Sequence, residues 1–217
     1  MADVQHHRSD DGKRRNTERS NSDLTAFLLL LLLAFYGPAT LIWLDIIPFA
    51  LRFHSLLISA VGLAVYVVLR GYSRRQLGLR TDNLKDALLI NMTFSAAAVG
   101  ALTVVYGLGL IRAPTVPTWN LFFPLYVVLF CPAQEFTCRA VLFAELERLK
   151  FGPVAQVLIT AITYAFIHII YRDLLILAAT FVIGVAWGAI YWFRPNFYAV
   201  SLSHAALGVT SILGGLV

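Results

Sequence analysis

The chain has 217 residues, of which 59% are hydrophobic and only 13% are charged, and its mean hydropathy is +0.75. This composition is too apolar for an ordinary soluble domain and indicates an integral membrane protein. The formal net charge of +5 does not indicate a nucleic-acid-binding protein, because the basic residues cluster at the ends of apolar segments, where they set orientation and contact anionic lipid.

The first 23 residues are polar, mixed in charge and free of hydrophobic periodicity, which predicts a disordered cytosolic tail over residues 1–23. The remaining residues, 24–217, are expected to form one transmembrane helical domain. Its first apolar run, from Thr25 to Phe49, is long enough to span a bilayer and is not followed directly by a small-residue cleavage site. This run therefore predicts an uncleaved first helix and not a signal peptide.

Apolar segments of about 20 residues, enough to cross a bilayer, recur along the chain. They cover residues 24–47, 54–70, 86–111, 119–148, 153–171, 174–193 and 196–217. The expected fold class is therefore all-α, a polytopic bundle of about seven transmembrane helices. The amino-terminal tail and residues 70–85 each carry five Lys or Arg residues, which places both in the cytoplasm. Seven crossings leave the carboxyl terminus outside, in what we expect to be the inner membrane of a bacterium.

Glu135 and Arg139 lie four residues apart within the fourth apolar segment. An ionised side chain is costly inside the hydrocarbon, so such residues usually face the bundle interior or a wet cavity and serve a pathway or a catalytic centre. His168 and His204 are embedded in later apolar segments. Pro132 predicts a kink beside Glu135 that frees backbone carbonyls. Together these residues predict a polar cavity within the bundle.

Three short patterns follow one another in the second half of the chain. The segment CPAQEFTCRAVLFAEL contains Gln134, Glu135 and Arg139; Tyr164 precedes His168 by four residues; and His204 precedes Gly208 by four residues. In this order they resemble the three motifs of the CAAX protease and bacteriocin-processing family of intramembrane endopeptidases. The upstream segment Gln76-Leu77-Gly78-Leu79-Arg80 is similar to a basic connector of that family.

The resemblance implies an intramembrane endopeptidase. It assigns catalytic positions to Glu135, His168, His204 and Arg139, and substrate-binding or supporting positions to Gln134 and Tyr164. Cys138, which lies between Glu135 and Arg139, is added as a supporting residue. Two positions depart from the family pattern. Gln134 stands where the family has a first Glu that is commonly assigned to water activation, and Gly208 stands where an Asn would assist an oxyanion-binding His. Because a glutamine cannot act as a general base at neutral pH, Glu135 must supply the carboxylate in an active enzyme.

Peptide hydrolysis needs a base for the water, an acid for the leaving amine and donors for the developing oxyanion. Glu135 with His168 can position and deprotonate the water, and His204 can donate to the oxyanion. Arg139, one turn from Glu135, can hold the carboxylate ionised and oriented, while Gln134 can restrain the water or the substrate backbone. In straight helices His204 would lie about 10 Å closer to the cytoplasmic face than Glu135, so a shared site requires tilt or a kink.

Other functions stay open at this level. Glu135 and Arg139 alone would serve as an internal ion pair that locks the bundle. A catalytically inactive relative would use the polar site for binding, as a transporter or an immunity protein. Two His and one Glu also form a known catalytic zinc set. However, the sequence has no His-Glu-x-x-His helix, and we expect neither a metal nor a cofactor.

Cys131 and Cys138 lie seven residues apart on one face of one helix, too far apart for a disulfide within a straight helix, and are expected to be thiols. A thiolate near Arg139 could attack a peptide in a sortase-like transpeptidation. The simpler interpretation of each cysteine is a small buried hydrophobic residue. The expected partners are a membrane-associated peptide or protein substrate and the lipid bilayer, without nucleic acid.

Overall fold

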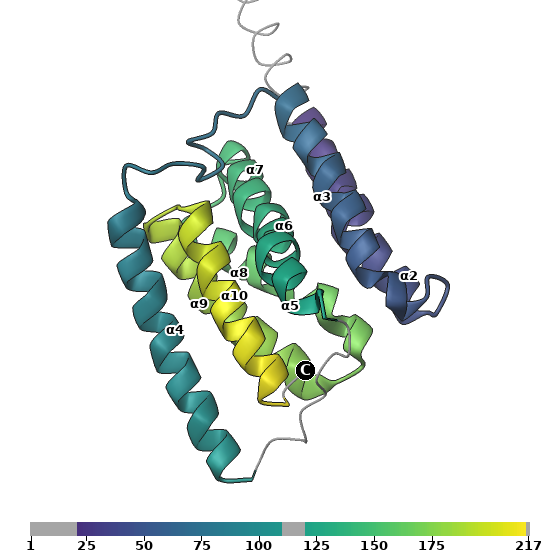
Figure 1. Ribbon diagram of the computed structural model, residues 1–217. Coiled ribbons are helices and arrows are strands. Elements are labelled where there is room, and N and C mark those ends of the chain that lie inside the picture. Colours follow the sequence, from purple (N-terminus) through teal and green to yellow (C-terminus); the bar gives the residue numbers. More distant parts are fainter. Residues whose placement is uncertain (1–20, 110–119, 216–217) are drawn as a thin grey trace, which may run out of the picture.

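The computed structural model describes residues 21–109 and 120–215, and within these residues every regular element is a helix. In chain order the elements are Asn21–Trp43, which contains the π-helical segment η1 (Leu32–Tyr36) and α2 (Gly37–Trp43), then η2 (Phe49–Leu51), α3 (Arg52–Leu69), α4 (Leu84–Gly107), α5 (Phe122–Leu125), η3 (Tyr126–Phe130), α6 (Cys131–Glu135), η4 (Phe136–Val141), α7 (Leu142–Arg148), α8 (Pro153–Phe166), η5 (Ile167–Tyr171), α9 (Leu174–Phe193) and α10 (Phe197–Leu213). The segments from α5 to α7 form one continuous helix, Phe122–Arg148, here called the central helix (Figure 1).

Within the described residues, six helices are long and apolar enough to cross a bilayer, and α10, with 17 residues, is a shorter apolar helix. This confirms the prediction of a polytopic all-α membrane protein. Six of the seven predicted spans are long enough to cross, and the seventh, predicted over residues 196–217, contains the shorter helix α10 in the described residues. The tail predicted for residues 1–23 lies outside the described residues up to position 20. Residues 21–23 belong to the first helix.

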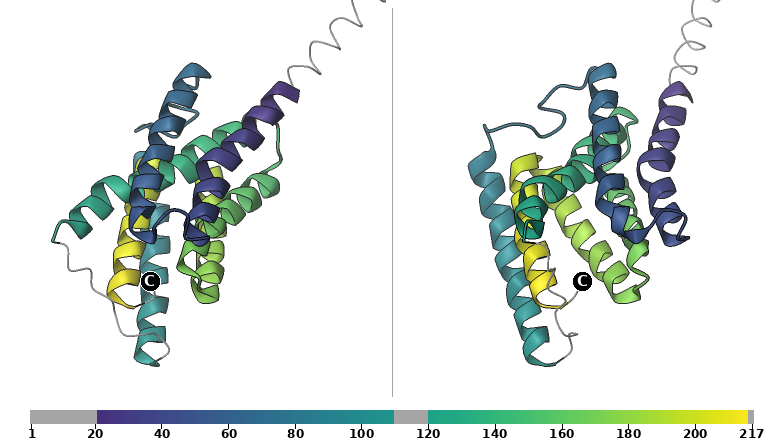
Figure 2. Two further views of the ribbon diagram at one scale, coloured as in Figure 1. Left: turned by 90° about the vertical axis from the view of Figure 1, so that its right-hand side faces the viewer. Right: turned by 45° about the vertical axis from the view of Figure 1, so that its right-hand side comes forward.

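The central helix lies between the first helix and α3 on one side and α10 and α4 on the other (Figures 1 and 2). In the most apolar 18-residue stretch of the central helix 67% of the residues are buried, compared with 11% in the corresponding stretches of the α3 and α4 spans. The outer helices expose large apolar side chains, such as Leu69 at 81% and Leu89 at 69%, as expected for surfaces in contact with lipid tails. The helix that carries Glu135 and Arg139 is thus the core of the bundle.

Pro132 interrupts the regular geometry of the central helix. It lies in α6, and the flanking segments η3 and η4 are both π-helical. Proline has no backbone N–H, and its ring clashes with the carbonyl four residues earlier, so a regular α-helical ladder cannot continue through it. A π-helical turn accommodates an extra residue and rotates the side chains that follow. The predicted distortion at Pro132 is therefore present as two wide turns that set the directions of the polar side chains.

Small residues bring α8 and α9 into close contact. A Cβ atom placed on Gly184 would lie 3.1 Å from Cα of Ala161, and one placed on Gly188 would lie 3.4 Å from Oγ1 of Thr160. Such small residues allow two membrane helices to pack backbone to backbone. Between the two helices, Arg172 adopts the left-handed conformation with φ of 54°, and Oδ1 of Asp173 accepts from the amides of Leu175 and Ile176. This turn starts α9 directly after η5.

The basic connector, residues 70–83, is bonded to the start of α10. The amide of Phe197 donates to the carbonyl of Gly78 over 2.9 Å, and the side-chain amide of Asn196 donates to the carbonyl of Arg80 over 2.8 Å. The Tyr191 hydroxyl donates to the carbonyl of Leu77 over 3.1 Å. Gly78 has φ of 66°, and a Cβ atom there would meet the Tyr191 ring, so this position needs glycine. The segment that resembles a family connector therefore fixes the start of α10.

A second buried carboxylate, Glu145 of α7, lies at the same end of the bundle and is fully buried. Its Oε1 accepts hydrogen bonds from the hydroxyls of Tyr66 at 2.8 Å and Tyr72 at 2.5 Å. Burial and the bond to Glu145 raise the pKa of Tyr72, which lies outside the spans, so its hydroxyl stays a donor at neutral pH. These bonds attach α3 and the basic connector to the central helix.

Candidate active site

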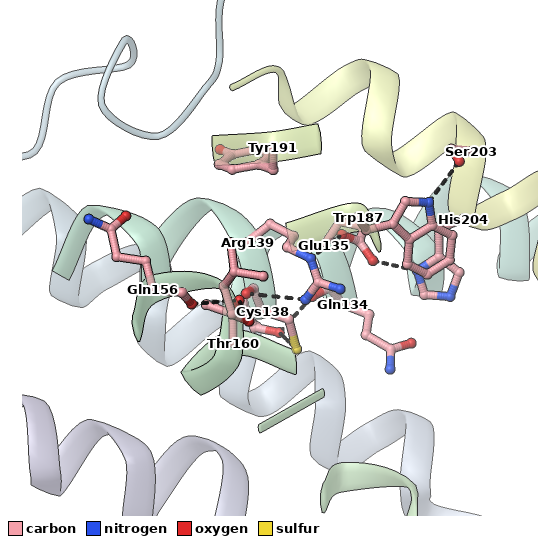
Figure 3. A network of polar contacts seen from close by, with 12 residues as sticks. Gln134, Glu135, Cys138, Arg139, Gln156, Thr160, Trp187, Tyr191, Ser203 and His204 are labelled. Atoms are coloured by element: carbon pink, nitrogen blue, oxygen red, sulfur yellow. Dashed lines mark hydrogen bonds and ion pairs between the residues drawn. The ribbon is translucent and has the colours of Figure 1, made fainter. Parts of the chain in front are cut away.

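Glu135, the last residue of α6, and His204 of α10 form a direct polar contact in the bundle interior. Glu135 is fully buried and His204 is 3% exposed. Oε1 of Glu135 lies 2.7 Å from Nδ1 of His204 (Figure 3). The difference in depth expected from straight helices is thus closed, because the distorted central helix and α10 bring the two side chains together. An ionised carboxylate only accepts hydrogen bonds, so Nδ1 of His204 carries the proton and Nε2 keeps a lone pair in the neutral ring.

Arg139 supplies the charge that compensates Glu135. Its side chain is fully buried, and its Nε lies 3.7 Å from Oε2 of Glu135, which is an ion-pair distance but too long for a hydrogen bond. The guanidinium carbon lies 4.8 Å from the centroid of the Tyr164 ring, a cation–π contact. Oε2 of Glu135 has no hydrogen-bond partner among the described residues. The pair is therefore held by charge, with Tyr164 as the platform under the cation.

His168 lies in the 3₁₀-helical segment η5, directly after α8. Its Nδ1 is 2.7 Å from the carbonyl oxygen of Tyr164. Since a carbonyl only accepts, Nδ1 donates, and Nε2 is the proton-accepting nitrogen of the neutral ring. The ring packs against Tyr164, with centroids 4.8 Å apart, and stacks on Tyr171 at 5.9 Å. Both predicted histidines therefore use Nδ1 to fix the ring and leave Nε2 for chemistry.

A hydrogen-bonded series of three residues, Trp187, Ser203 and Ser95, lies against the His204 ring and was not predicted from the sequence. The Trp187 indole stacks on the imidazole, with centroids 5.0 Å apart and an interplanar angle of 28°. Its N–H donates to the Ser203 hydroxyl over 2.8 Å, and the hydroxyls of Ser203 and Ser95 are 2.7 Å apart. Figure 3 shows Trp187 and Ser203 beside His204. A lone tryptophan and single serines in apolar segments form no motif, so no sequence pattern predicted these contacts.

A cavity of about 560 Å³ lies beside these residues and extends toward Phe49, Arg52 and Tyr171, at the end of the bundle away from the basic connector. Most of its lining is apolar or aromatic. The polar side chains that line it include those of Tyr126, Gln134, Thr137, His168 and His204. Glu135 and Arg139 do not line it, so these two act on a ligand in the cavity only through neighbours. Two residues of the first motif, the half-buried Gln134 and Thr137, line the cavity.

The two cysteines are buried free thiols, as expected. Neither Cys131 nor Cys138 is among the residues that line the cavity. Cys138 instead lies next to Thr137, whose hydroxyl is 3.6 Å from the sulfur. Its place is therefore within the helix packing around Arg139, and neither thiol is presented directly to the cavity.

The described residues contain no group of three His, Cys, Asp or Glu side chains arranged to hold a metal ion. Glu135 and His204, two members of the zinc set considered above, are joined directly by a hydrogen bond. His168 directs Nδ1 to a backbone carbonyl. In this arrangement Glu135 and His204 form one hydrogen-bonded pair, and His168 is bonded separately to the backbone.

A family model described as type II CAAX prenyl endopeptidase Rce1-like matches residues 116–210. This segment matches the Rce1-like endopeptidases of the CAAX protease and bacteriocin-processing family. The match confirms the family inferred from the three motifs. The Rce1-like segment contains the central helix, α8, α9 and most of α10, and hence every residue assigned to the site from the sequence. No curated protein and no solved structure matches the chain.

The geometry of the ion pair predicts a large effect of Arg139→Gln on stability. Removing the cation leaves the Glu135 carboxylate buried without its compensating charge, and breaking a buried pair in this way costs about 3 kcal/mol. We expect a lower midpoint of thermal unfolding in detergent micelles. The double variant Glu135→Gln/Arg139→Gln removes both charges and is expected to be more stable than the single variant. Arg75→Gln, at a side chain that is 73% exposed, is the control; equal midpoints for Arg139→Gln and Arg75→Gln would contradict the prediction.

Proposed function

We propose that this protein is a glutamic-type intramembrane endopeptidase that hydrolyses a peptide bond in a membrane-associated peptide or protein tail. The observation that carries the proposal is the buried hydrogen bond of 2.7 Å between Glu135 and His204, at the wall of a cavity that His168 also lines. The match to endopeptidases over residues 116–210 supports the same class of reaction. A cavity within an apolar bundle suits a substrate that is delivered by the bilayer.

In the proposed mechanism His204 activates the water. Its Nε2 takes a proton from a water molecule in the cavity, while Glu135 holds Nδ1–H and stabilises the imidazolium that forms. Arg139 keeps the carboxylate side of this pair electrically balanced. The sequence analysis gave water activation to Glu135 with His168, and oxyanion binding to His204. We now prefer His204 as the immediate base, because Glu135 is bonded to that ring and does not line the cavity.

The other cavity residues complete the reaction. His168 has its Nε2 available and, when protonated, can deliver a proton to the leaving amine. The Gln134 carboxamide can donate an N–H bond to the carbonyl oxygen as it becomes negative, and its own oxygen can accept from the substrate backbone. For the orientation in the membrane we propose that the amino terminus and the basic connector lie in the cytoplasm and the carboxyl terminus outside, in a bacterial inner membrane.

One observation favours a second candidate function. The first motif presents no carboxylate to the cavity: its lining residues are Gln134 and Thr137, and neither an amide nor a hydroxyl acts as a base at neutral pH. If His204 alone is too weak a base, the same cavity would bind a peptide without cleaving it. The second candidate is therefore a catalytically inactive binding or immunity protein of the same family.

Alanine at Glu135, His168 or His204 is expected to abolish cleavage while the protein still folds in membranes. Each change removes either a member of the Glu135–His204 pair that activates the water or His168, the proton donor for the leaving amine. The measurement is release of peptides in vesicles that contain the purified protein and candidate substrates, which are first identified by comparing membrane proteomes with and without the active protein. Glu147→Ala, at an exposed carboxylate of α7, is the matched control. A Glu135→Ala variant that cleaves at the wild-type rate would contradict the proposed mechanism.

Gln134→Ala is expected to slow cleavage moderately, by the equivalent of about 1–3 kcal/mol for a lost buried hydrogen bond. Gln134→Glu restores paired carboxylates and is expected to keep or raise the rate. Both rates are measured with the same vesicles and substrate. A wild-type protein that is inert, combined with a Gln134→Glu variant that cleaves, would establish the inactive binding protein as the native function.

Cleavage is expected to be independent of metal ions, because a carboxylate and two imidazoles are sufficient for water activation and proton delivery. The test is treatment of the purified protein with a strong chelator, followed by dialysis and the peptide-release assay, and the activity is expected to be unchanged. Loss of activity that zinc alone restores would instead favour the zinc set of Glu135, His168 and His204.

A further inference from the structure

Tyr126, the first residue of η3, brings a phenol into the cavity beside His204. The residue lines the cavity, and its ring lies edge-on to the imidazole of His204, with centroids 6.3 Å apart and an interplanar angle of 79°. The phenol also stacks on Phe122, with centroids 5.6 Å apart and an angle of 17°. These two aromatic contacts restrict the orientation of the ring and hence the direction of the hydroxyl.

Gly208 makes room for this phenol on α10. It lies four residues after His204, so both residues are on the same face of the helix. A Cβ atom placed on Gly208 would overlap the Tyr126 hydroxyl and would lie 2.8 Å from two ring carbons. Glycine is unfavourable in the interior of a helix compared with alanine, so its presence here is explained by the close approach of the phenol. The Tyr126 hydroxyl is therefore held against α10, one turn from His204.

We propose that the Tyr126 hydroxyl donates a hydrogen bond to the carbonyl oxygen of the peptide bond that His204-activated water attacks. This inference rests on the proposed function. In the reaction, the water oxygen bonds to the carbonyl carbon, the C=O π electrons move to the oxygen, and the tyrosine O–H bond stays intact while its hydrogen bond strengthens. The phenol thus contributes more to the transition state than to substrate binding. Gln134 lies on the same cavity and supplies the second donor.

The first test is Tyr126→Phe, which keeps the ring and its packing and removes only the hydroxyl. We expect kcat to fall about 100-fold, as for the loss of one oxyanion donor, with KM changed less than about twofold because the donor acts mainly in the transition state. Tyr106→Phe, at a 56% exposed tyrosine of α4, is the matched control and keeps wild-type kinetics. Suppose that the wild type cleaves and the Glu135→Ala variant is inactive in the same assay. An unchanged kcat for Tyr126→Phe then overturns this inference and leaves the proposed function intact. A wild type that does not cleave overturns the proposed function and this inference with it.

The second test separates hydrogen bonding from packing. Gly208→Ala places a methyl group against the phenol and is expected to lower both the midpoint of thermal unfolding and kcat. Tyr126→Ala in addition to Gly208→Ala removes the crowding, so the unfolding midpoint is expected to recover relative to Gly208→Ala while kcat stays low. Recovery of kcat together with the midpoint would show that Tyr126 only fills space, and would overturn the proposal.

Discussion

The architecture depends on one electrostatic constraint: a carboxylate, a guanidinium and an imidazole are buried together where the surroundings are apolar. A charge in such a place is tolerated only when it is paired and screened from lipid. Glu135 meets this condition by contacting His204 on one oxygen and Arg139 near the other. The central helix must then be the most enclosed helix of the bundle, and the remaining helices surround it with their apolar faces toward the lipid.

Local irregularity of the backbone turns this buried pair into a site. The π-helical turns on both sides of Pro132 decide which residues of the first motif face Arg139 and which face the cavity. The 3₁₀-helical segment η5, directly after α8, likewise directs His168 toward the cavity, and the Tyr164 carbonyl fixes its ring. Within a membrane such departures from the α-helix occur where protein or a cavity surrounds the backbone, and here they coincide with the polar residues.

Much of this arrangement could be predicted from the sequence, because hydrophobic length determines the spans and because Glu135, Arg139, His168 and His204 are conspicuous in apolar segments. The roles were harder to predict. Whether Gln134 or Glu135 faces the cavity depends on the rotation that the π-helical turns impose, and helical periodicity does not contain this rotation. The contact of Trp187 with His204 and that of Tyr126 with Gly208 join segments far apart in the chain, and these residue types are common in membrane helices as packing groups.

The hydrogen bonds between the basic connector and the start of α10 also fix a distance. Phe197 is bonded to Gly78, and His204 follows seven residues later, about 10 Å along the same rigid helix. The hydrogen bonds to this polar loop, and not contacts with lipid, therefore set the depth of the imidazole in the membrane. The bilayer can thicken or thin around this protein without sliding its histidine past Glu135.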